Sequence, residues 1–130
     1  MKLVSVCLTV ASAVLLSAAG LDGVFSKAQV EHGAKLFQER CAGCHGDRLE
    51  GGDHGPPLRD DAFWQEWTGQ PARALYSRVI STMPPDEPGG LAEKDVIDIL
   101  AHLAVVNGAR LGTKAIERAD ELNSVKLERP

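Results

Sequence analysis

Apolar residues recur at helical spacing in three stretches of the chain. The first stretch follows Ser26-Lys27-Ala28-Gln29, which has the form of a capping box because the Ser and Gln side chains can each accept a hydrogen bond from an exposed backbone N–H. Its apolar positions, Val30, Ala34, Phe37 and Cys41, are spaced i, i+4, i+7 and i+11 and therefore share one face. The pattern predicts a helix over residues 26–41.

The second stretch begins at Pro71, which suits the first turn of a helix, and stops at Thr82, because Pro84 and Pro85 cannot continue a helix. Its apolar face consists of Leu75, Tyr76, Val79 and Ile80. A helix over residues 71–82 is therefore predicted.

The third stretch covers residues 91–107 and has the widest apolar stripe. The stripe consists of Val96, Leu100, Leu103 and Val106, flanked by Ile97, Ile99 and Ala104. Leu91 can pack on Val96 across the start of this helix, where Ala92 is a weak cap, and Gly108 suits the position after its end. Gly33 in the first helix lowers helix propensity, and this favours a close crossing of two helices at that point.

Less regular segments separate and follow these helices. Residues 46–61 are rich in Gly, Asp and Pro and have no apolar period, so they are predicted to form a loop. The only aromatic cluster follows, with Phe63, Trp64 and Trp67. Residues 109–130 form a charged C-terminal tail, in which Ile116, Ala119 and Leu122 indicate a short helix. The sequence leaves open whether this tail packs on the rest of the chain.

The first twenty residues have the pattern of a secretory signal peptide. Lys2 precedes an apolar run over residues 3–16, and four small residues follow it. We therefore expect residues 1–20 to be cleaved off, together with Cys7, and the mature protein to be periplasmic without a stable membrane span. An uncleaved membrane anchor is the alternative, although the run is short for a spanning helix of about 20 residues.

The main candidate for chemistry is Cys41-Ala42-Gly43-Cys44-His45. Two thiols three positions apart, followed directly by an imidazole, are the signature of c-type haem attachment. Each thiol can add to one vinyl group of a haem, and the histidine can then reach the iron as an axial ligand. One motif predicts one covalently bound haem c per chain. A porphyrin would also add apolar volume to a small domain in which only 5% of residues are aromatic.

Two other interpretations of the paired cysteines compete with haem attachment. A redox-active dithiol is expected near a βαβ pattern, which this chain lacks. A zinc site needs four ligands, so Cys41 and Cys44 would have to recruit two histidines. The available histidines are His32, His45, His54 and His102.

Met83 is the candidate for the second axial position. Once Met1 leaves with the signal peptide, Met83 is the only thioether that can complete a His/Met pair on the iron. A gap-filling methionine is the alternative, although a position between a helix and two prolines is unsuited to core packing. We expect Trp67 to lie on the porphyrin and to donate its indole N–H to a haem propionate, and His102 to be partly exposed rather than a ligand.

The net charge bears on the choice of partner. The chain carries a formal charge of −4, which becomes −5 when Lys2 is removed, and it shows no basic patch for nucleic acid. A negative carrier favours a partner whose contact patch is basic or largely apolar.

These residues resemble the class I cytochromes c, and among them the small bacterial periplasmic monohaem cytochromes that are related to the cytochrome partners of quinoprotein (PQQ-dependent) alcohol dehydrogenases. The resemblance covers about residues 30–108. The motifs that carry it are Cys41-Ala42-Gly43-Cys44-His45-Gly46, Gly51-Gly52, Gly55-Pro56-Pro57-Leu58, Phe63 with Trp67, Met83-Pro84, Pro88-Gly89-Gly90-Leu91 and Asn107-Gly108. Residues 109–130 match those partner cytochromes only loosely.

The resemblance implies an all-α cytochrome c fold over residues 21–108, with the first and last helices crossing near Gly33 around the haem. It implies that the Pro56 carbonyl accepts a hydrogen bond from His45 Nδ1. The expected function is single-electron transfer between redox partners, either a quinoprotein dehydrogenase or a terminal oxidase or reductase, in transient complexes and without catalysis by the chain itself. A haem that loses Met83 readily and binds a gas or peroxide is the alternative.

Overall fold

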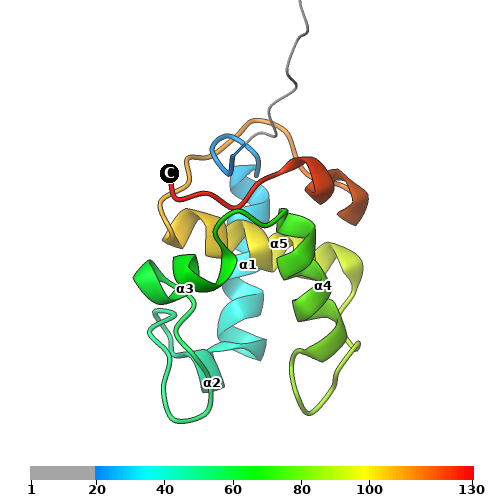
Figure 1. Ribbon diagram of the computed structural model, residues 1–130. Coiled ribbons are helices and arrows are strands. Elements are labelled where there is room, and N and C mark those ends of the chain that lie inside the picture. Colours follow the sequence, from blue (N-terminus) through cyan, green and yellow to red (C-terminus); the bar gives the residue numbers. More distant parts are fainter. Residues whose placement is uncertain (1–19) are drawn as a thin grey trace, which may run out of the picture.

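Five α-helices and one 3₁₀ helix form the regular structure of residues 20–130, the part of the chain that the computed structural model describes (Figure 1). The elements are α1 (Lys27–Arg40), α2 (Ala42–His45), α3 (Asp60–Trp67), α4 (Ala72–Thr82), α5 (Glu93–Val106) and η1 (Ala119–Ser124). Within this range, the extended segments form only isolated bridges. The expected all-α fold class is confirmed, whereas the predicted signal peptide with Cys7 lies outside the described residues.

The α1 helix begins where its capping box was predicted. The Ser26 hydroxyl accepts a hydrogen bond from Gln29 N at 3.3 Å, and Gln29 Oε1 accepts one from Ser26 N at 3.5 Å. The α5 helix lacks a side-chain cap at Ala92, and Gly108 follows its end with a φ of +102°. Local signals therefore determine where α1 begins and where α5 ends.

The α1 and α5 helices cross in close contact at Gly33. A Cβ atom placed on Gly33 would lie 1.7 Å from the backbone oxygen of Asp98, so only glycine allows this approach. In consequence the deeply buried row of α1 is Gln29, Gly33 and Phe37. Of the predicted apolar face, Phe37 is fully buried, whereas Val30, Ala34 and Cys41 are partly buried; Val30 and Cys41 pack against the core.

A buried polar cluster lies beside this crossing. Asp98 is 0% exposed, and its carboxylate accepts hydrogen bonds from Gln29 Nε2 at 3.0 Å and Lys94 Nζ at 2.6 Å, with His32 Nδ1 at 2.8 Å. The Gln29 side chain also exchanges two hydrogen bonds with the backbone of Ile116. Buried polar groups are tolerated when they are paired in this way. The cluster around Asp98 and Gln29 therefore joins α1, α5 and the tail.

The tail, whose order the sequence left open, packs on the rest of the molecule. Leu122, Val125 and Leu127 are buried in the core. Backbone hydrogen bonds join Leu127 to residues 69 and 70, Val125 to Ala72, and Gly112 to Phe25. Residues 109–130 therefore complete the hydrophobic core from the side opposite α2 (Figure 1).

The α3 helix was not predicted, and the expected loop ends before it. The helix begins at Asp60 and buries Phe63, Trp64 and Trp67 on one side. The spacing i, i+1, i+4 is helical, but eight residues give too short a pattern to be distinguished from a loop.

The placement of the helix ends matters for function. In Figure 1, α2 and the C-terminal end of α4 lie at the same end of the molecule, whereas η1 and residue 130 lie at the other.

Among residues 20–130, none of the helices is both long enough and apolar enough to cross a membrane.

Candidate functional site

The two cysteines and the following histidine form a single tight turn. Cys41 ends α1, and its backbone oxygen accepts hydrogen bonds from Cys44 N at 3.2 Å and His45 N at 3.0 Å. The second cysteine and the histidine therefore lie one helical turn from Cys41. Both thiols are free; Cys41 is half-buried and Cys44 is exposed.

The thiol environment argues against a redox-active pair. Burial raises the pKa of the Cys41 thiol to about 11, so the thiol stays protonated at neutral pH in the folded chain. Redox-active cysteines instead have a lowered pKa that maintains the thiolate. The zinc interpretation also finds no ligand set, because residues 20–130 contain no group of three or more His, Cys, Asp or Glu placed to hold a metal ion.

The imidazole of His45 is buried and fixed in orientation. Its Nδ1 lies 2.8 Å from the backbone oxygen of Pro56, which is the contact that the resemblance implied. A carbonyl oxygen can only accept, so Nδ1 carries the proton and Nε2 keeps the lone pair. This is the arrangement in which a second group orients a metal-binding histidine.

Two glycines let the loop over residues 46–59 approach this turn. A Cβ atom on Gly55 would lie 2.9 Å from Cys44 O and 3.0 Å from His45 Nδ1, so any side chain there would displace the imidazole or the loop. Gly51 has a φ of +80° and donates its N–H to His45 O at 2.7 Å. The sequence placed these glycines in the predicted loop and in motifs of the resemblance, but it could not show their contacts, because these depend on the folded turn.

Met83 follows α4 at the same end of the molecule as α2 (Figure 1). Its backbone N–H donates to Val79 O at 2.9 Å, which ends the helix, and its side chain is partly buried. The Met83-Pro84 peptide bond is cis. Met83 is positioned by the end of α4, whereas Cys41, Cys44 and His45 lie in one local turn.

Trp67 is the last residue of α3 and is 8% exposed. The guanidinium carbon of Arg78, on α4, lies 5.9 Å from its ring centroid. Trp64 differs, because it packs edge-to-face on Phe63 with the ring centroids 5.1 Å apart. Trp67 therefore contacts the helix that leads to Met83, whereas Trp64 contacts the tail through Arg129, whose guanidinium carbon lies 6.0 Å from its ring centroid.

The His102 ring is partly buried, as expected, and packs on Phe37 with the ring centroids 5.4 Å apart. Its Nε2 atom is buried without a hydrogen-bond partner in the described part of the chain. Burial lowers the pKa of His102, so its ring is neutral at pH 7.

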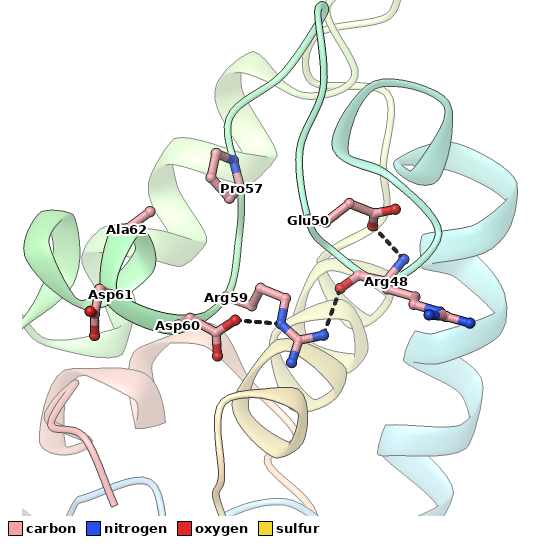
Figure 2. Close-up of a pocket in the computed structure, with 7 residues that line it drawn as sticks. All are labelled: Arg48, Glu50, Pro57, Arg59, Asp60, Asp61 and Ala62. Atoms are coloured by element: carbon pink, nitrogen blue, oxygen red, sulfur yellow. Dashed lines mark hydrogen bonds and ion pairs between the residues drawn. The ribbon is translucent and has the colours of Figure 1, made fainter.

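A surface hollow of about 560 Å³ lies beside the loop over residues 46–59, but its chemistry does not suit a porphyrin (Figure 2). Arg59 lies across it, with Nε 2.8 Å from Asp60 Oδ2 and Nη1 3.2 Å from Arg48 O. Glu50 accepts a hydrogen bond from Arg48 N at 2.8 Å. Arg59 and Asp60 form an ion pair within the hollow, and none of the candidate site residues lines it.

Comparisons with known proteins agree with this arrangement. The family model described as cytochrome c oxidase, cbb3-type, subunit III matches residues 28–103. The crystal structure of the sulfane dehydrogenase SoxCD from Paracoccus pantotrophus is similar, with a TM-score of 0.55 and 25% sequence identity over 85% of this chain. The match covers 60% of the SoxCD chain. A search of curated proteins found no match.

Proposed function

We propose that this chain, which belongs to the family described as cytochrome c oxidase, cbb3-type, subunit III, is a periplasmic monohaem carrier of single electrons. The chain is a small class I c-type cytochrome, and a cytochrome c domain implies haem and electron transfer. We further propose which residues bind the iron, that each chain holds one haem, that the protein is periplasmic, and which classes of redox partner it meets. The observation that carries it is the Cys41–His45 turn with His45 held by Pro56.

The residues of the turn fit covalently attached haem c. Cys41 and Cys44 are both free thiols on one helical turn, so each can form one thioether bond to the porphyrin. His45 offers Nε2 to the iron, because Nδ1 is committed to Pro56 O. Bound haem c would supply an iron that gains and loses one electron.

Met83 is proposed as the second axial ligand and Trp67 as the donor to a propionate. Met83 lies at the end of α4 that shares one end of the molecule with α2, and Trp67 contacts α4 through Arg78. With His45 and Met83 both bound, no coordination position is left for a substrate, and this favours a carrier over a gas- or peroxide-binding protein. A c-type cytochrome also has to be exported for haem attachment, which supports a periplasmic location.

Covalent attachment gives the first test of this function. The protein should keep its haem in acidified acetone, because thioether bonds do not depend on the fold. The double variant Cys41→Ala with Cys44→Ala should lose at least nine tenths of its haem in the same solvent. Extraction of haem from the unmodified protein would contradict the proposal. Stoichiometric zinc without haem would support the zinc interpretation instead.

The proposed donor is a dehydrogenase, and a quinoprotein alcohol dehydrogenase is the specific candidate. The similarity to a structure titled sulfane dehydrogenase supports the dehydrogenase class, and the family description, which names an oxidase subunit, supports an oxidase as acceptor. A carrier has to leave as readily as it binds, so the interface should fall below about 1,200 Å².

The partner test compares two rates by stopped-flow absorbance. The oxidised cytochrome should be reduced by the dehydrogenase plus its alcohol much faster than by the alcohol alone. The rate should fall as salt rises, because the net charge of −5 expected for the mature chain attracts a basic contact patch. Fast oxidation by a terminal oxidase combined with negligible reduction by the dehydrogenase would assign the donor to another enzyme class.

A further inference from the structure

An ion pair joins the end of α1 to the loop that follows Met83. Arg40 Nη2 lies 2.5 Å from Glu87 Oε2, although 47 residues separate the two in the sequence. Arg40 is the last residue of α1 and directly precedes Cys41, and Glu87 lies four residues after Met83. Within residues 20–130, this is the one hydrogen bond or ion pair between the loop over residues 83–92 and α1 or α2.

The loop itself holds Glu87 in place. Glu87 N donates to Pro84 O at 3.0 Å, and Gly90 N donates to Glu87 O at 3.0 Å, so two successive turns close around this residue. A Cβ atom on Gly90 would lie 2.5 Å from Glu87 Cγ, which shows that the glutamate stem lies against the Gly90 backbone. The carboxylate therefore extends from a well-ordered turn toward the end of a helix.

The pair is too exposed to contribute much to overall stability. The Arg40 side chain is 37% exposed and the Glu87 side chain is 60% exposed, and ion pairs of this kind stabilise a fold only slightly. Its position is more informative than its strength. One partner lies beside the first haem-attachment cysteine, and the other lies in the loop that begins with the proposed methionine ligand.

We propose that the Arg40–Glu87 pair is a tether that keeps the loop over residues 83–92 closed, so that both residues position Met83. The inference rests on the proposed function, because it needs Met83 as an iron ligand. Without the tether, hydrogen bonds attach the loop only at its junctions with α4 and α5, and a larger fraction of molecules should have Met83 dissociated. The tether changes the fraction of molecules in which Met83 is dissociated, but Met83 is the iron ligand with or without it.

Competition with imidazole measures that population in the purified ferric holoprotein. Added imidazole can bind the iron only where Met83 has dissociated, so its apparent affinity rises with the open fraction. Glu87→Gln should bind imidazole about two- to fivefold more tightly than the unmodified protein, the range expected for an exposed ion pair. Arg40→Gln should show the same change from the other side of the pair.

The matched control is Asp86→Asn, which removes an equal charge from the neighbouring position of the same loop and should leave the affinity unchanged. The reversed pair, Arg40→Glu with Glu87→Arg, should restore the unmodified affinity. Salt of about 1 M should reduce the difference between Glu87→Gln and the unmodified protein, because it screens exposed charges. A charge effect that did not depend on the Arg40–Glu87 pair would show no recovery in the reversed variant.

The outcomes separate this inference from the function on which it rests. If the unmodified ferric protein shows a methionine-to-iron charge-transfer band and Glu87→Gln binds imidazole no more tightly than Asp86→Asn, the tether is wrong and the carrier function stands. If the unmodified protein lacks that band and binds imidazole without competition, Met83 is not a ligand. In that case the tether and the proposed His/Met pair are both overturned.

Discussion

Replacing Met83 with histidine should lower the midpoint potential by on the order of 0.1 V or more, within the roughly 0.8 V over which axial ligands set haem potentials. A neutral thioether stabilises ferrous over ferric iron more than an imidazole does, so exchanging one for the other favours the ferric state. Met83 begins a loop at the end of α4, so the substitution should leave the helical core intact. A redox titration followed by absorbance measures the shift.

His102→Gln is the control for the potential. His102 packs on Phe37 in the helical core, so its loss should leave the potential within experimental error of the unmodified value. An unchanged potential in Met83→His would show that another residue occupies the second axial position. His54 and His102 are then the candidates, and each can be tested by the same titration.

Gly33→Ala should lower the free energy of unfolding by about 3 kcal/mol or more, at the upper end of what an inserted methyl group costs in a packed core. The new Cβ would lie 1.7 Å from Asp98 O, which belongs to the backbone of α5 and cannot rotate away. The better helix propensity of alanine offsets only about 1 kcal/mol of this loss. Urea unfolding of the holoprotein, followed by circular dichroism, measures the change.

Gly43→Ala is the matched control, because Gly43 is also a helical glycine but a Cβ atom placed on it would meet no other atom within 4 Å. Its stability should be unchanged or rise by no more than about 1 kcal/mol, the gain in helix propensity from glycine to alanine. Equal stabilities for Gly33→Ala and Gly43→Ala would mean that the α1–α5 contact can relax, contrary to the close crossing.

Local patterns were sufficient to predict the helices that frame the site. Apolar spacing and the capping box at Ser26 placed α1, prolines bounded α4, and Gly33 indicated the crossing. The haem-attachment motif could be identified for the same reason, since its two thiols and imidazole lie within one turn. Signals of this kind act over a few residues, so they can be recognised without knowledge of the fold.

Features that depend on distant partners could not be predicted. Gln29 and Asp98 look like surface residues within helical patterns, yet they bond to each other across 69 residues in the buried cluster, and Gln29 reaches Ile116 across 87. The Arg40–Glu87 pair spans 47 residues in the same way. Nothing in the local sequence distinguishes these side chains from solvated ones, so only the fold identifies them.

The packing of residues 109–130 affects how the chain is made. Synthesis proceeds from the N-terminus, so Leu122 and Leu127, which fill the core, are the last of its members to leave the ribosome. Until they arrive, the part of the core between α4 and the tail cannot close completely, because Val125 and Leu127 bond to the backbone at Ala72 and Gln70. A chain truncated before Leu122 would leave this part of the core uncovered and be exposed to proteases.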